Sequence, residues 1–189
     1  MLIGFTGKIG SGKSTAAKYL AEKYGYTRLN FKDALIKEVE ERFPELLREM
    51  AELYNLGGQR FLTTSQYLKL VPRPLLLRRL LQNYGTDVRR KDDSNYWADK
   101  WELLYMEIKN KLVVVDDVRF LNEADKIRGY HGTIIRINGV TQTNNATHSS
   151  EDEMSKIQVN GIITNHQSID DLHFQLDKLC QPNWTNYDG

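Results

Sequence analysis

The sequence predicts an α/β fold with a mostly parallel sheet, because short apolar strands alternate with segments of helical periodicity along the 189 residues. A first strand at 2–6 leads through a glycine-rich turn at 7–12 into a helix at 13–24. The unbroken apolar run at 112–115 is typical of a parallel strand that is covered on both faces. These patterns indicate a three-layer sandwich in which helices cover both faces of the sheet.

The other elements follow from periodicity and from turn residues. Gly25 ends the first helix, 26–31 is a predicted second strand, and 32–54 is helical but divided or kinked at Pro44. After the Gly-Gly break at 57–58 comes an ambiguous stretch, 59–70, with a short helical piece. The later predicted elements are helices at 75–84 (ended by Gly85), 99–109, 122–128 and 169–180, and strands at 133–137 and 159–164.

The domain organisation predicted from length and pattern is one domain spanning 1–189. The region from about 38 to 108 carries helices without an obvious strand. We therefore expect a helical insertion over the ligand edge of the sheet.

Composition limits the class of protein. The net charge of +1 gives no global attraction to nucleic acid or to a membrane surface. Cys180 is alone and closes no intramolecular disulfide, which suits a reducing compartment. The chain has no apolar run of membrane-spanning length and no signal-peptide pattern at its start. We expect a cytoplasmic protein with no membrane partner, in the host cytoplasm if a phage encodes it.

The glycine-rich turn carries the strongest functional signal. Residues 7–14 read GKIGSGKS and match the pattern GxxxxGK[ST] between a strand and a helix. Glycines let backbone N–H groups turn toward a polyphosphate, and the following helix adds its positive end. Lys13 would reach the β- and γ-phosphates of ATP while the Ser14 hydroxyl ligates Mg²⁺. The predicted ATP-binding residues are Gly7, Lys8, Gly10, Ser11, Gly12, Lys13, Ser14 and Thr15.

This motif predicts a P-loop NTPase fold and identifies the phosphate donor, but not the reaction. A turn that binds nothing is the alternative interpretation. Motors and switches usually need coupling elements beyond a minimal sheet, whereas this chain has an arginine-rich helical insertion. That arrangement favours a small kinase, which must hold a second substrate beside ATP and exclude water.

An acidic pair follows the strand at 112–115. In a P-loop fold such a strand end faces the phosphates and can hold Mg²⁺, so Asp117 is a candidate ligand. Arg119 lies two residues further and would share its side of an extended chain, as a clamp on the transferring group. A structural Asp–Arg pair at the sheet edge is the alternative. Glu123 would fix the Arg119 guanidinium or form an exposed helix pair.

Charge is unevenly distributed along the chain. Residues 73–91 have a local charge of +5, and 150–189 have a local charge of −5. Guanidinium groups opposite a P-loop suit the phosphate of a nucleotide-like second substrate. The alternatives are a solvated helix face or an RNA-contacting patch. The residues that carry the positive charge are Arg73, Arg78, Arg79, Arg89, Arg90 and Lys91, against Asp87.

Together these segments resemble the deoxynucleoside monophosphate kinases of tailed bacteriophages, within the nucleoside-monophosphate-kinase-like P-loop group. Beyond the P-loop, four segments carry the resemblance across nearly the whole chain. They are NFKDALIK at 30–37, similar to SFADxLK; LQNYGTDVRR at 81–90, similar to LQxxGTDxxR, with Trp97 following; DVRFLNE at 117–123, similar to DVRFxNE; and HSSE at 148–151, similar to HxSE. Asn30 and Lys32 depart from the family pattern, which leaves the shape of the acceptor pocket open.

The resemblance implies transfer of the ATP γ-phosphoryl group to the 5′-phosphate of a deoxynucleoside monophosphate, giving ADP and a deoxynucleoside diphosphate. The implied catalytic residues are Lys13, Arg90, Asp117, Arg119 and Glu123, with Ser14 and Asp117 at the metal. The implied substrate-binding residues are Asp33, Gln82, Thr86, Arg89, Arg90, Trp97 and Arg119.

Several of these roles have structural alternatives. Trp97 either stacks on the nucleotide or packs in the core, and Gln82 and Asp33 either face the acceptor or serve as capping or surface residues. His148 is not expected to be a general base, because an ionised phosphate oxygen needs none. We expect it to order a loop, with Ser150 and Glu151 capping the next segment.

Other functions remain open at this stage. Dephospho-coenzyme A kinase is a rival because its opening sequence is similar to residues 3–7 and the P-loop after them, although it usually has an acidic pair where this chain has only Asp33. Phosphomevalonate kinase is a second rival. A P-loop ATPase that binds nucleic acid comes from another class, but we expect no stable nucleic-acid partner. A homodimer is compatible with the sequence, which fixes neither the oligomeric state nor the accepted bases.

Overall fold

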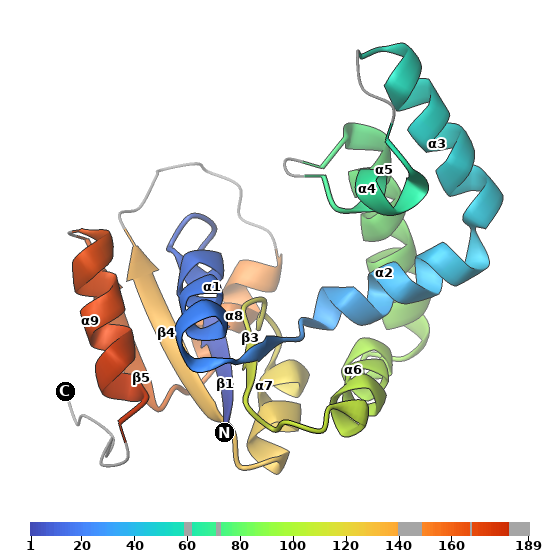
Figure 1. Cartoon of the computed structure of the whole chain (residues 1–189). Helices are drawn as coiled ribbons and strands as arrows, with labels where there is room; N and C mark the ends of the chain where they lie inside the picture. Colours follow the sequence, from blue (N-terminus) through green and yellow to red (C-terminus); the bar gives the residue numbers. More distant parts are fainter. Residues whose placement is uncertain (59–61, 71–72, 140–148, 167, 182–189) are drawn as a thin grey trace. The chain divides into compact units, whose positions relative to one another are not determined.

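A computed structural model of the chain describes residues 1–58, 62–70, 73–139, 149–166 and 168–181 (Figure 1). The chain divides into two compact units. Unit 1 comprises Met1–Phe31 and Trp101–Gly189, and unit 2 is the continuous segment Lys32–Lys100. In the part of the chain that the structure describes, no helix is both long enough and apolar enough to cross a membrane.

Unit 1 is built on a five-stranded sheet whose described pairings are all parallel. Its strand order is β2-β3-β1-β4-β5, with Gly4 of β1 level with Val115 of β3 and Ile134 of β4. This arrangement confirms the predicted α/β class. The strands are β1 (Leu2–Thr6), β2 (Thr27–Arg28), β3 (Val113–Val115), β4 (Thr133–Gly139) and β5 (Gly161–Asn165).

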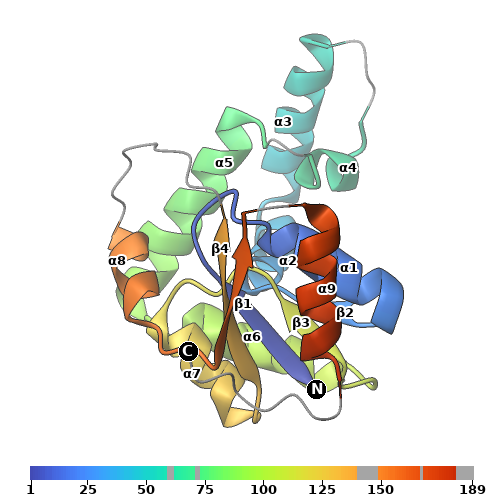
Figure 2. The same cartoon turned by 90° about the vertical axis from the view of Figure 1, so that its left-hand side faces the viewer.

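Helices cover both faces of this sheet (Figure 2). Helices α1 (Lys13–Tyr24) and α9 (Ile169–Leu179) pack on one face, where Leu20 and Leu176 join Ile3, Phe5 and Ile137 in a buried core. Helix α7 (Leu121–Gly129) contacts β1 and β4 and packs beside α8 (Ser149–Lys156). The three predicted layers are therefore present in unit 1.

Unit 2 contains helices and no strand in its described residues. Helix α2 (Phe31–Arg42) begins at Phe31, where the first part of unit 1 ends. Pro44 starts a separate helix, which is one of the two predicted alternatives. The others are α3 (Pro44–Leu56), α4 (Thr64–Leu68), α5 (Leu75–Gln82), the π-helix η1 (Asn83–Arg90) and the start of α6 (Tyr96–Glu107). Unit 2 overlaps the predicted insertion at about 38–108 but begins and ends earlier. Whether it acts as an acceptor-binding insertion stays a prediction.

The predicted strand at 26–31 is wrong beyond Arg28. Polar side chains at the strand ends bind the backbone there: Asn30 Oδ1 accepts the Asp116 N–H at 2.8 Å, and Asp117 Oδ1 accepts the Phe31 N–H at 3.0 Å. The second bond satisfies a donor at the start of α2, so the chain turns into a helix at Phe31.

The predicted helix end at Gly85 is also wrong, because helical structure continues through η1 to Arg90. Gly85 serves close packing instead: a Cβ there would lie 3.0 Å from Leu35 Cδ2, and its carbonyl accepts the Trp97 Nε1–H at 2.8 Å. Helix α8 is an element that periodicity did not predict. Other differences are small shifts of boundaries, as in α6, which begins at Tyr96 rather than at residue 99.

Candidate active site

The turn between β1 and α1 has the backbone conformation of a phosphate cradle. Gly7, Gly10 and Gly12 have φ values of 137°, 80° and 102°, a region that favours glycine. Gly7 also lies against β4, because a Cβ there would be 2.3 Å from the Ile137 carbonyl oxygen. Helix α1 begins at Lys13, so the N–H groups of its first turn, which lack acceptors within the helix, lie at the end of this turn. The predicted P-loop geometry is present.

The Lys13 side chain lies along its own loop. Its Nζ donates to the Gly7 carbonyl at 2.6 Å and to the Lys8 carbonyl at 2.7 Å. Ser14 and Thr15 are exposed in the first turn of α1, whereas Ser11 is buried. An ammonium and exposed hydroxyls therefore gather at a helix N-terminus, which is a suitable environment for phosphate and its metal ion.

The ends of β4 and β5 brace the loop, a feature that the motif alone did not reveal. Asn165 Nδ2, at the end of β5, donates to the Ser11 carbonyl at 2.9 Å. At the end of β4, a Cβ on Gly139 would lie 2.6 Å from Ser11 Cα. Both residues occupy the carboxyl ends of parallel strands, where ligand sites form. Their position just after the predicted apolar strands is the sequence signal that could have identified Asn165 and Gly139.

The two acids after β3 have different surroundings. Asp116 is buried and accepts from Arg28 Nη2 at 2.6 Å. Asp117 is half-buried and accepts the Phe31 N–H. Their segment lies beside the end of β1, because the Val118 N–H donates to the Phe5 carbonyl at 3.3 Å. A structural Asp–Arg pair is thus present, but it joins Asp116 to Arg28 and leaves Asp117 as the predicted site residue.

Glu123 does not hold the Arg119 guanidinium through its described contacts, nor is it an exposed helix partner. It is 2% exposed, and its Oε2 accepts the backbone N–H groups of Arg119 at 2.8 Å and Phe120 at 3.2 Å. These bonds satisfy donors at the start of α7. The Arg119 side chain is exposed. Glu123 therefore fixes the backbone that carries Arg119, which corrects the predicted role.

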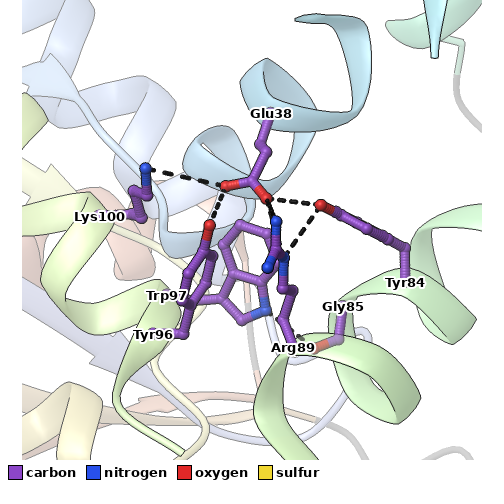
Figure 3. A network of polar contacts seen from close by, with 7 residues as sticks. All are labelled: Glu38, Tyr84, Gly85, Arg89, Tyr96, Trp97 and Lys100. Atoms are coloured by element: carbon purple, nitrogen blue, oxygen red, sulfur yellow. Dashed lines mark hydrogen bonds and ion pairs between the residues drawn. The ribbon is translucent and has the colours of Figure 1, made fainter. Parts of the chain in front are cut away.

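In unit 2, Arg89 is engaged in an ion pair with Glu38 (Figure 3). Its Nη2 and Nε donate to Glu38 Oε1 at 2.7 and 3.0 Å, and its guanidinium lies 4.7 Å from the centre of the Tyr96 ring. The predicted substrate contact of Arg89 would have to compete with these bonds. The neighbouring candidates Gln82 and Thr86 are exposed, and Arg90 is half-buried.

Trp97 is a core residue of unit 2. It is 3% exposed, its Nε1–H binds the Gly85 carbonyl, and its ring meets Tyr84 and Tyr96 edge to face (Figure 3). This buried position favours the packing alternative over nucleotide stacking. Asp33 is half-buried in the first turn of α2.

Polar partners shift the ionisation of the Glu38 network. Burial alone would raise the pKa of Glu38, but bonds from Tyr84, Tyr96 and Arg89 outweigh it and lower that pKa. Burial and the bond to Glu38 raise the pKa of Tyr96 to about 12. The Glu38 carboxylate is therefore charged near neutral pH, with its partners protonated.

One predicted segment falls largely outside the described residues. His148 lies in 140–148, and the side chains of Ser150 and Glu151 are not described, although helix α8 begins at Ser149. The predicted ordering and capping roles therefore stay predictions. Of the other candidates, unit 1 holds the P-loop, Asp117, Arg119 and Glu123, whereas unit 2 holds Asp33, Gln82, Thr86, Arg89, Arg90 and Trp97.

Comparisons with known proteins find related kinases. Residues 63–176 match the family model described as deoxynucleotide monophosphate kinase. A protein of Acanthamoeba polyphaga mimivirus, named among the deoxynucleotide monophosphate kinases, is 32% identical over 189 residues and covers 93% of this chain and 94% of its own length. A dephospho-CoA kinase of Borreliella burgdorferi is 30% identical over 133 residues, which are 69% of this chain and 60% of that protein.

Among solved structures, TT1252 from Thermus thermophilus is similar, with a TM-score of 0.51 and 20% identity over 95% of both chains. At this identity the likeness concerns the fold alone, and it agrees with the α/β fold found here. The family model spans more than half of the chain, and the viral relative spans nearly all of it. The chain is thus a kinase that belongs to the deoxynucleotide monophosphate kinase family.

Proposed function

We propose that this kinase transfers the γ-phosphoryl group of ATP to the 5′-phosphate of a deoxynucleoside monophosphate, releasing ADP and a deoxynucleoside diphosphate. The observation that carries the proposal is the P-loop, where the Lys13 ammonium lies across the cradle at the N-terminus of α1. In a member of this family, such a cradle is suited to hold the polyphosphate of the donor.

Mg²⁺ fits two residues of the site. Ser14, in the first turn of α1, offers an exposed hydroxyl, and Asp117, after β3, offers a half-buried carboxylate; oxygen atoms are the ligands that Mg²⁺ prefers. Among the described residues, no group of three or more His, Cys, Asp or Glu side chains forms a protein cage for a metal. Mg²⁺ usually binds through one or two carboxylates, substrate phosphates and several waters, so it would take its other ligands from phosphate and water and would neutralise charge on the transferring group.

On the acceptor side, we propose that Arg90, Thr86, Gln82 and Asp33 of unit 2 contact the deoxynucleotide. Arg119 would stabilise charge on the transferring phosphoryl group from unit 1. An ionised phosphate oxygen needs no general base, so positioning and charge neutralisation supply the rate.

Dephospho-CoA kinase is the second candidate, because a relative of that name is 30% identical over 69% of this chain. Both reactions use ATP, but one acceptor is a phosphate group and the other a ribose hydroxyl. The identity of the acceptor therefore separates the two candidates.

The test is a coupled assay of ADP release with each deoxynucleoside monophosphate, dephospho-coenzyme A and phosphomevalonate. Turnover of at least one deoxynucleotide, with diphosphate product detected by chromatography, is the expected result. The variant Lys13→Ala should fold normally and abolish transfer, which excludes a contaminating kinase. Turnover of dephospho-coenzyme A alone would replace the proposal with the second candidate, and turnover of no deoxynucleotide would refute it.

A further inference from the structure

We propose that Glu38 is a positioning residue for the acceptor site: its carboxylate sets the π-helix η1 so that Gln82, Thr86 and Arg90 meet the deoxynucleotide. This inference rests on the proposed function. It assigns a role to a residue outside the sequence motifs that predicted the site.

Glu38 joins three helices through one carboxylate (Figure 3). From α2, its Oε1 accepts from Tyr84 Oη at 2.6 Å and from Arg89 Nη2 at 2.7 Å, both on η1. Its Oε2 accepts from Tyr96 Oη at 2.5 Å and lies 3.9 Å from Lys100 Nζ, both on α6. Its side chain is only 14% exposed, so water screens these contacts weakly.

The contacts on η1 lie on both sides of Thr86, one of the proposed acceptor residues. Tyr84 and Arg89 bracket Thr86 in sequence, and Arg89 directly precedes Arg90. Arg89 also donates to Tyr84 Oη at 3.0 Å, so the two contacts with Glu38 are coupled. A shift of the Glu38 carboxylate would therefore move the backbone that carries Thr86 and Arg90.

The π-helical winding of this segment is a second observation that points to the same role. π-Helices are rare, and they occur mostly as short bulges within α-helices, frequently at functional sites. Here η1 is supported by Glu38 and by the bond between Gly85 and Trp97. Gln82 ends α5, and Thr86 and Arg90 follow it at four-residue intervals in η1, so the three residues are spaced about one helical turn apart.

The same contacts separate the functions of the two adjacent arginines. The Arg89 guanidinium binds Glu38 and Tyr84 and lies near two tyrosine rings. A phosphate that took Arg89 would leave the half-buried Glu38 carboxylate with fewer donors, which is costly. Arg89 therefore holds η1 in place, and the residues that contact the acceptor are Gln82, Thr86 and Arg90.

The experiment compares Glu38→Gln with Glu102→Gln in the full-length protein. Glu102 is a matched control in unit 1, where its carboxylate binds Lys126 at 2.8 Å and Tyr130 at 2.6 Å. KM for the deoxynucleotide, KM for ATP, kcat and thermal unfolding are measured for both variants. Tyr96→Phe, which removes one donor to Glu38, is a milder second variant that keeps the inference testable if Glu38→Gln does not fold.

We expect Glu38→Gln to raise KM for the deoxynucleotide about tenfold or more, with KM for ATP within about twofold of the wild type. Glu102→Gln should leave both constants unchanged. Arg89→Lys should retain part of the affinity that Arg89→Met loses. Equal changes in both KM values, or a loss of kcat that merely follows the unfolded fraction, would overturn the positioning role.

The wild-type protein keeps the two proposals distinguishable. If it turns over a deoxynucleotide and Glu38→Gln changes nothing, the positioning role fails alone. If the wild type turns over no deoxynucleotide, the proposed function fails before any variant is considered.

Discussion

Asn165 offers a direct test of how the sheet supports the P-loop. Its Nδ2 donates to the Ser11 carbonyl at 2.9 Å. The substitution Asn165→Ala would remove this donor. A hydrogen bond of this kind contributes about 1 kcal/mol, and leaving Ser11 without its partner loosens the cradle. We therefore expect KM for ATP to rise about fivefold, with KM for the deoxynucleotide unchanged.

Asn165→Asp should have a larger effect in the same direction. The isosteric carboxylate cannot donate, and it places negative charge beside the Ser11 carbonyl and the proposed polyphosphate site. A cost of about 2 kcal/mol corresponds to an increase of about 30-fold in KM for ATP.

Steady-state kinetics with each substrate varied in turn is the assay. Gln175→Ala is the matched control, because the Gln175 amide binds the backbone of Thr164 on the same strand but has no described bond to the P-loop. The reasoning is refuted if Asn165→Asp leaves KM for ATP unchanged, or if Gln175→Ala raises it as much.

Three further perturbations test other parts of the site and of the fold. Gly139→Ala would place a Cβ 2.6 Å from Ser11 Cα, so we expect KM for ATP to rise roughly tenfold through overpacking, while Gly129→Ala, with open space around its Cβ, is the kinetic control. Arg119→Ala should lower kcat roughly 10³-fold, and near-normal turnover would remove Arg119 from the catalytic residues. Burial would raise the pKa of Asp177, but bonds from Lys23, Tyr19 and Tyr24 lower it from 3.8 to about 2, so its contribution is present above pH 3.8 and is lost as the pH falls through about 2. Asp177→Asn should thus lower the free energy of unfolding in urea by about 1–2 kcal/mol at pH 7 after allowance for solvent screening, and an equal difference at pH 2 would contradict this assignment.

Local signals in the sequence were sufficient for much of unit 1. The P-loop pattern, the apolar strands and Pro44 each act over a few residues, so the β1–α1 turn, the parallel sheet and the division between α2 and α3 could be predicted. Gly85 shows where local signals fail. The same glycine serves as a helix stop or as a site of close packing, and only its contact with Leu35 decides between them.

Long-range contacts explain the remaining differences at the site. Glu38 and Arg89 are separated by 51 residues, and Asn165 and Ser11 by 154, so neither pair forms a motif in the sequence. The sequence predicts that Glu123 lies near Arg119. Its carboxylate binds backbone N–H groups and not the guanidinium because Glu123 is buried at the start of α7, which the sequence does not show. Periodicity gives the face of a helix and not the partner that covers it.

The strand order has a consequence for how the chain folds. Strand β1 pairs with β3 on one side and with β4 on the other, so Ile3 gains its strand partners Val114 and Thr133 only after more than 100 further residues have been synthesised. Such pairings carry a large loop-closure cost and form slowly. Unit 2 is helical and continuous in sequence, so most of its contacts are available sooner during synthesis. We therefore expect the segment in the middle of the chain to acquire structure before its amino-terminal strand does.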